Sequence, residues 1–230
     1  RCRMSQELNM PLIRLLVVKD WQLFQKQLAA LVLAGIVALA LLGLAKPWSF
    51  YLGSLLLIVV LVAAACFAIG TSLLTERKEQ TLAFVMSLPV SPLDMTVSKL
   101  AGNLITFGVP FLVLLLGTLL VILGTPLPDG LLTMAILLFG HVLLAYCLSL
   151  TVAMQVESEG WNLFVMITSM VLINPFIMLL GQIDSIREPA RGNDIVWSTP
   201  ALAILAAQIL LSLAALGYIL WRHRRRAAFY

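Results

Sequence analysis

Six long stretches of the chain are apolar and contain no Asp, Glu, Lys or Arg. They cover residues 28–45, 50–74, 100–123, 131–156, 161–180 and 200–221, and each contains between 18 and 26 residues. The hydrocarbon core of a bilayer is about 30 Å thick, and a helix that rises 1.5 Å per residue crosses it in roughly 20 residues. Lipid offers the backbone no hydrogen-bond partners, and the alternating pattern of barrel strands is missing, so each stretch must be helical. The pattern predicts an all-α integral membrane protein with six transmembrane helices.

The composition excludes the other common classes of protein. Only 11% of the 230 residues are charged and 61% are hydrophobic, whereas an average soluble domain carries about 25% charged residues. A soluble globule of this size lacks the interior to bury so much apolar surface, and disordered segments are poor in hydrophobic residues. Three scattered cysteines do not make a disulfide scaffold. Without a repeat or a long linker, residues 1–230 are interpreted as one transmembrane domain.

The distribution of Lys and Arg predicts the orientation in the membrane. Twelve of these residues lie before the first span, between spans two and three, or after the last span, and three lie on the other side. Positive residues favour the cytoplasmic side, so both termini are expected in the cytoplasm of a multi-pass protein of the inner (cytoplasmic) membrane. The first span lacks a small-residue cleavage site, so we interpret it as a membrane span rather than a secretory signal.

Two flanking segments have the composition of membrane anchors. Residues 11–27 predict an interfacial helix with a polar face and an apolar stripe. The stripe consists of Ile13, Val17, Trp21, Phe24 and Leu28. A tryptophan such as Trp21 is typical of the headgroup level, and passive anchoring is the simplest interpretation of the stripe. The arginine-rich segment 222–226 follows the last span directly, which favours contact with anionic lipid and not with nucleic acid.

The segment 75–99 is much longer than the neighbouring turns and predicts two short helices around a break. Pro89 disfavours helix at the residue before it and ends the first helix. Ser91-Pro92 is typical of a helix start, and Asp94 can complete a capping box. Leu93, Val97 and Leu100 then share one face at positions i, i+4 and i+7. We expect a short capped helix in the cytoplasm before the third span, resting either on lipid headgroups or on a partner protein.

The chain lacks the residues that most catalytic sites need. It has no phosphate-binding loop and no paired metal-ligand spacing, so we expect no cofactor and no catalysis in this chain. His141 and His223 are the only histidines, and His141 is interpreted first as a structural residue. The few polar residues inside the spans are expected to form hydrogen bonds between helices. Asn174-Pro175 predicts a kink in the fifth span, because Pro175 has no N–H to donate.

Three short runs of sequence resemble a known family. They are Glu76-Arg-Lys-Glu79-Gln-Thr81-Leu82, Ser87-Leu-Pro89-Val-Ser91 and Ser98-Lys99-Leu100. Together with six spans and an amphipathic first helix, they resemble the permease subunits of type-2 ABC exporters. Gln80 stands where that family often has a glycine. The topology resembles the family over the whole chain, and the motif covers residues 75–100.

The resemblance implies a coupling helix within 75–99 that seats in a groove of a separate ATP-binding subunit. The residues implied in this contact are Glu76, Glu79, Leu82, Pro89, Ser91, Leu93, Asp94, Val97 and Lys99. It also implies two ATP-binding subunits that hold ATP and Mg²⁺, and a second permease subunit, identical or homologous. The substrate path would lie between the two permease subunits along spans one, two and five. Asn174, Pro175 and His141 are the candidates for lining or gating it, and the loop 182–199 resembles the external gate.

Two other interpretations belong to different classes of function. One is a membrane scaffold or assembly subunit without a pore of its own, which co-purification of an ATP-binding subunit would distinguish from the permease. The other is an intramembrane enzyme that uses His141 or the pair Glu157 and Glu159, and unchanged function after mutating those residues would exclude it.

Overall fold

The computed structural model describes residues 10–70, 92–156 and 158–227, and within these ranges the chain forms helices and no strand. Six segments are long and apolar enough to cross a membrane. They are Trp21–Gly43, Pro47–Ile69, Thr96–Gly124, Leu131–Gln155, Gly160–Gln182 and Thr199–Arg222. Five of them begin within four residues of a predicted span, the first begins seven residues before its predicted start at 28, and 71–74 lie outside the described residues. The prediction of an all-α, multi-pass membrane protein is confirmed.

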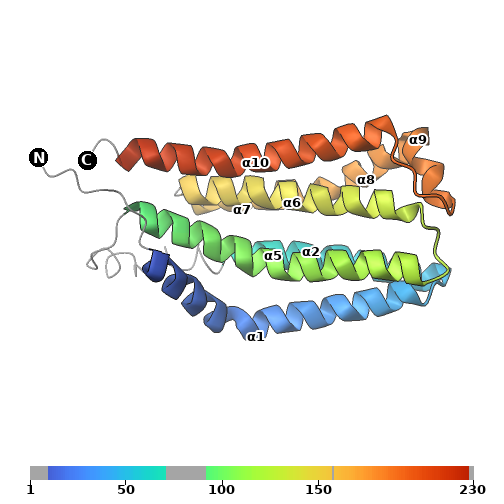
Figure 1. Cartoon of the computed structure of the whole chain (residues 1–230), viewed down its shortest axis with the longest axis horizontal. Coiled ribbons are helices and arrows are strands. Elements are labelled where there is room, and N and C mark those ends of the chain that lie inside the picture. Colours follow the sequence, from blue (N-terminus) through green and yellow to red (C-terminus); the bar gives the residue numbers. More distant parts are fainter. Residues whose placement is uncertain (1–9, 71–91, 157, 228–230) are drawn as a thin grey trace, which may run out of the picture.

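The helices run side by side along the long axis of the molecule in two groups (Figure 1). The first group contains α1 (Met10–Gly43), α2 (Pro47–Ile69) and α5 (Pro92–Gly124). The second contains α6 (Leu131–Gln155), α7 (Glu159–Val171), α8 (Ile173–Gln182) and α10 (Thr199–Ala227). We call the end where α1 begins and α10 finishes the termini end. The loop end carries the connections 44–46, 125–130 and 183–198.

Glycines allow the helices of the first group to approach closely. A Cβ on Gly53 of α2 would lie 2.9 Å from the carbonyl oxygen of Ala38 in α1. One on Gly35 of α1 would lie 2.2 Å from Leu114 of α5, and one on Gly117 of α5 would lie 2.4 Å from Leu39 of α1. Because lipid provides no hydrophobic driving force between helices, such small residues favour association through close packing.

Polar contacts hold α6 and α10 of the second group together. The Gln208 side chain donates through Nε2 to the carbonyl oxygen of Leu137 at 3.1 Å. Thr151 Oγ1 lies 3.3 Å from the carbonyl oxygen of Ala215. Near the termini end, Arg222 donates to Oε1 of Gln155. These contacts confirm the expected hydrogen bonds between helices for Gln155 and Gln208, and each is worth roughly 0.6 kcal/mol in a membrane.

The two groups meet along a column of aromatic rings between α5 and α6. Tyr146 of α6 stacks on Phe107 of α5 with ring centroids 3.9 Å apart. Phe107 contacts Phe111 at 5.3 Å, and Phe111 contacts Phe139 of α6 at 5.5 Å. Offset and edge contacts of this kind contribute about 0.5–1.5 kcal/mol each beyond their buried area. All four rings belong to the buried core.

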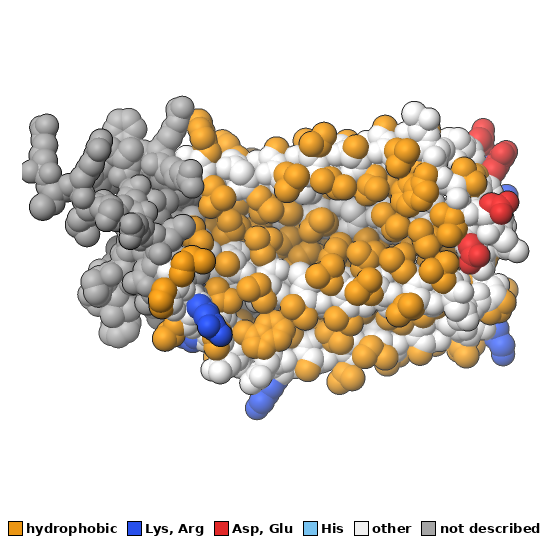
Figure 2. Space-filling view, viewed as in Figure 1, with side chains coloured by type: hydrophobic (Ala, Val, Ile, Leu, Met, Phe, Trp, Pro, Cys, Tyr) orange, Lys and Arg blue, Asp and Glu red, His pale blue; other side chains and the backbone are white. Residues whose placement is uncertain are grey.

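Short helices cover the loop end of the second group. They are α9 (Asp184–Arg187) and the 3₁₀ turn η2 (Pro189–Arg191). The N–H of Gly130 donates to the carbonyl oxygen of Gly192 at 3.1 Å. The side chain of Ile186 in α9 is buried against the bundle. Figure 2 shows acidic side chains gathered at this end, whereas apolar side chains dominate the long face between the two ends. That division fits a molecule whose middle lies in lipid.

Two predicted boundaries between helices are wrong. The interfacial helix 11–27 and the first span join into the single helix α1, which bends along its length (Figure 1). Its apolar stripe also packs against the rest of the protein, because Phe24 makes an edge contact with Phe67 of α2, with ring centroids 5.6 Å apart. The short helix expected before the third span is the beginning of α5. In both cases no proline or glycine separates the segments, so the backbone hydrogen bonds continue.

Candidate functional site

The structure describes the predicted coupling residues only in part. Glu76, Glu79, Leu82, Pro89 and Ser91 lie outside the described residues. Leu93 and Asp94 belong to the first turn of α5, and their side chains are also outside what is described. Val97 and Lys99 are described and half-buried. Helix α5 is described from Pro92 onward, and the predicted cap at Ser91 lies outside the described residues.

The first turns of α5 bury a face that is more polar than the sequence pattern predicted. Thr96, Ser98 and Asn103 are buried together with Leu100. Asn103 donates from Nδ2 to the carbonyl oxygen of Lys99 at 3.2 Å within the same helix. Of the predicted apolar face, Leu100 is buried, Val97 is half-buried, and the side chain of Leu93 lies outside what is described, so the face as a whole stays a prediction. Polar side chains lie inside, where they contact the protein itself.

The fifth span is broken, as Asn174-Pro175 predicted. Helix α7 ends at Val171 and α8 begins at Ile173. In an unbroken helix the N–H of residue 175 would donate to the carbonyl oxygen of Val171, and proline has no such N–H. The hydrogen bonds resume at once, because Phe176 donates to the carbonyl oxygen of Leu172 at 3.1 Å. The break therefore removes one backbone hydrogen bond, and the helix continues on both sides of it.

The three candidates for lining or gating a path do not converge on one point. Asn174 and Pro175 are exposed on the outside of α8. His141 of α6 stacks on Phe176 with ring centroids 4.4 Å apart and an angle of 12° between the rings. Residues two apart on a helix point roughly 200° apart, so Asn174 and Phe176 face opposite ways. His141 thus contacts the inner side of α8, and Asn174 lies on its outer side.

Several buried polar atoms have no partner among the described residues. They include Nε2 of His141, the hydroxyl oxygen of Tyr146 and Oε1 of Gln208. The sequence pattern did not single out Tyr146, because a tyrosine inside an apolar run has no signal of its own. Its side chain is 0% exposed in the aromatic column. Among the described residues no group of three or more His, Cys, Asp or Glu side chains is placed to hold a metal ion.

The fifth span presents a broad uncovered face. Only 17% of its residues are buried, against 44% in the second span. The exposed side chains of this face include Trp161, Phe164, Ile167, Thr168, Val171, Asn174, Pro175 and Met178. Most of them are large and apolar, and two are polar. The face must be covered by lipid, by another protein or by a mixture of both.

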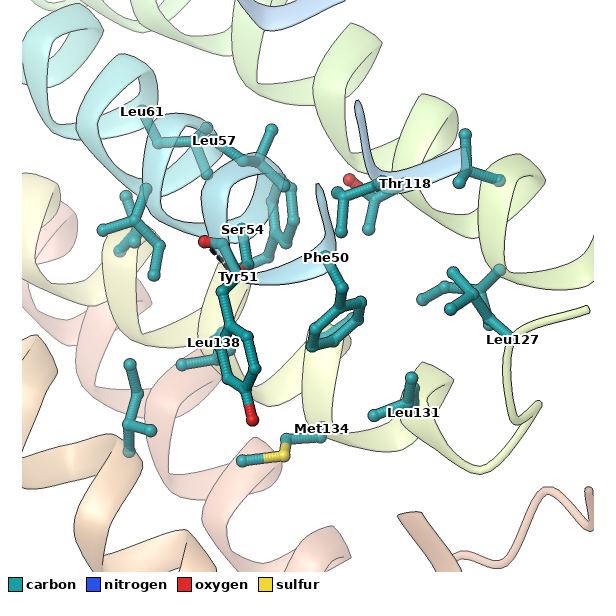
Figure 3. Close-up of a pocket in the computed structure, with 18 of the residues that line it drawn as sticks. Phe50, Tyr51, Ser54, Leu57, Leu61, Thr118, Leu127, Leu131, Met134 and Leu138 are labelled. Atoms are coloured by element: carbon teal, nitrogen blue, oxygen red, sulfur yellow. Dashed lines mark hydrogen bonds between the residues drawn. The ribbon is translucent and has the colours of Figure 1, made fainter. Parts of the chain in front are cut away.

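An apolar cavity of about 390 Å³ opens between the two helix groups near the loop end. Its wall comes from α2, α5, α6 and α8, with Leu42 from α1 and Leu127 from the connecting loop. Figure 3 shows Phe50 and Tyr51 from the first turns of α2 lying opposite Leu131, Met134 and Leu138 of α6. No local sequence pattern predicted it, because segments distant in the sequence build it together.

No protein-family model, curated protein or solved structure matches this chain. The fold and the membrane character stand on the helices themselves. Function is therefore inferred from the geometry above together with the resemblance carried by residues 75–100.

Proposed function

We propose that this chain is the permease subunit of an ATP-driven exporter of the type-2 ABC class. It pairs with a second permease subunit, and two separate ATP-binding subunits hold ATP and Mg²⁺ and hydrolyse the nucleotide. The chain itself carries no catalysis. The motif between residues 75 and 100 and the six membrane segments support this proposal. The termini end then faces the cytoplasm, in agreement with the excess of Lys and Arg there.

The exposed side chain of Asn174 is the observation that carries the proposal. Asn174 lies eight residues before the end of the fifth span at Gln182, about 12 Å along the helix and within the hydrocarbon. A carboxamide without a partner costs roughly 4–8 kcal/mol in hydrocarbon. An amide at this depth is therefore expected to face water or another polar surface. A path between two permease subunits provides such a surface.

The continuous helix α5 offers a physical route for the coupling. Helix α5 runs from Pro92 through the membrane to Gly124 as one element. Force applied near Pro92 by the ATP-binding subunits moves this helix as a unit, and the break at Leu172 lets α8 move relative to α7. ATP drives such a change only if it binds the two states with different affinity.

The proposal is tested by purification and by access of reagents to the fifth span. We expect an ATP-binding subunit to co-purify with the full chain extracted in mild detergent, and mass spectrometry identifies it. In a background with Cys2, Cys66 and Cys147 replaced by alanine, N174C is expected to react with a water-soluble, membrane-impermeant thiol reagent. The matched control is L210C, at a residue of α10 that is equally within the membrane and 66% exposed. It is expected to stay unmodified, because it faces lipid.

The outcomes separate the permease from its alternative. If an ATP-binding subunit co-purifies and N174C reacts at the rate of L210C, the placement of Asn174 on the path is wrong. If no ATP-binding subunit accompanies a chain that remains functional, the exporter proposal is rejected. The membrane scaffold without its own pore then becomes the better explanation.

A further inference from the structure

The apolar cavity near the loop end has the properties of a binding site for a lipid chain. We infer that it holds one hydrocarbon chain of a phospholipid from the membrane leaflet at the loop end. This site lies inside one chain, between its own two helix groups. It therefore goes beyond the proposed transport function and does not depend on it.

The chemistry of the wall excludes a polar occupant. Three hydroxyl groups belong to the wall: that of Tyr51, whose side chain is exposed, and those of Ser54 and Thr118 among the aliphatic and aromatic side chains. Ser54 donates to the carbonyl oxygen of Tyr51 at 3.1 Å, and Thr118 donates to the carbonyl oxygen of Leu114 at 2.7 Å. Both hydroxyl hydrogens are therefore already used by the helices that carry them. A peptide or a polar solute would bring donors and acceptors that this wall cannot satisfy, and each unsatisfied group is costly.

The length of the cavity matches one leaflet. Its wall on α2 runs from Phe50 to Leu61, and its wall on α6 runs from Leu131 to Val142. Each stretch spans eleven helical steps, or about 17 Å. Half of a hydrocarbon core is about 15 Å thick. An acyl chain that enters at headgroup level and fills the length of the cavity thus reaches the middle of the membrane.

The volume favours one chain. The cavity of about 390 Å³ lies at the small end of the range of about 300–1,000 Å³ that is typical of ligand pockets. This favours a single hydrocarbon chain over two chains side by side.

Tyr51 marks where the chain enters. Its side chain lines the cavity and is 73% exposed. It belongs to the first turns of α2, close to the loop end (Figure 3). Tyrosine is enriched at the level of lipid headgroups, where its ring is apolar and its hydroxyl meets polar groups. The opening therefore lies where a phospholipid places its headgroup, and this favours a bilayer phospholipid as the source of the chain.

The test is photo-crosslinking of the purified full chain in detergent micelles. The probe is a phosphatidylcholine with a diazirine on one acyl chain, and labelled peptides are mapped by mass spectrometry. We expect saturable labelling within 50–61 and 131–142. A135F fills the cavity from α6 and is expected to lower this labelling about fivefold or more, because its ring occupies the space that the acyl chain needs. The control A207F adds the same ring at an exposed position of α10 and is expected to change nothing.

A second filling variant guards against a fold defect. S54L fills the cavity from α2 and decides the question if A135F fails to give a monodisperse protein. Labelling that is unsaturable, spread over all lipid-exposed segments and unchanged in the filling variants overturns the inference. A free fatty acid with the same diazirine distinguishes the source, and labelling of the cavity by the acid alone also overturns it. No ATP-binding subunit is needed, so this result is independent of the transport proposal.

Discussion

Replacing Gly53 by alanine tests the close packing of α1 against α2. The added methyl group would lie 2.8 Å from the backbone nitrogen of Leu42 and 2.9 Å from the carbonyl oxygen of Ala38. Both atoms belong to the backbone of α1, so neither can move aside without moving the helix. Overpacking of this kind costs about 1–3 kcal/mol.

The cost of the clash is isolated by comparison with a second helix-interior glycine that has open space around its added Cβ. Alanine is favoured over glycine in a helix interior by about 1 kcal/mol, and this gain applies to both variants. Gly108 of α5 has no atom within 4 Å of its added Cβ, so G108A carries the gain without the clash. The difference in unfolding free energy between G53A and G108A is therefore expected to equal the clash, about 1–3 kcal/mol.

Thermal unfolding in one detergent, followed by the fluorescence of the five tryptophans, measures this difference. We expect G53A to unfold at a lower temperature than G108A, by about 2–4 °C for each kcal/mol in a protein of this size. Equal unfolding temperatures for the two variants would show that α1 and α2 do not approach as closely as the structure has them.

Three further predictions follow from the contacts in the membrane. P175A restores a backbone N–H that can donate to the carbonyl oxygen of Val171. It is expected to raise the unfolding temperature and to lower ATP-dependent transport in reconstituted vesicles. G140A places a Cβ 2.3 Å from Oε1 of Gln208 and is expected to destabilise the chain. In a Q208A background the same change is expected to cost nothing. A double-mutant cycle on the free energy of unfolding measures the difference. V97P interrupts α5 and is expected to abolish stimulation of the ATP-binding subunit by the permease, with V97A as the control that keeps the helix; equal stimulation in the two variants argues against the coupling role.

The spans could be predicted from the sequence because lipid imposes one simple requirement. A charged side chain is costly in hydrocarbon, so the charge-free stretches mark the membrane segments directly. The break in the fifth span was also predictable, since Pro175 removes a donor at a known position. The continuity of α1 and α5 could not be predicted. A helix that leaves the lipid meets a different solvent, but its backbone hydrogen bonds need not end there.

The candidate site depends on contacts that no local pattern contains. The cavity needs side chains from α1, α2, α5, α6 and α8, so it exists only after these helices pack. The sequence placed His141 and Asn174 together as possible path residues, and only the packing of Phe176 shows that they lie on opposite sides of α8. Gly53 likewise becomes informative only when the backbone of α1 lies next to it.

Both helix groups contain contacts between helices that are distant in the sequence, and this has a consequence for biosynthesis. Helices α1 and α2 are neighbours along the chain, so their glycine contact forms as soon as both have left the ribosome. The bond from Gln208 to Leu137 joins residues 71 positions apart. Helix α6 must therefore wait in the membrane, or beside the insertion machinery, until α10 has been translated. The last helix closes the assembly, and a nascent chain that stops before it leaves the second half of the molecule without its polar partners.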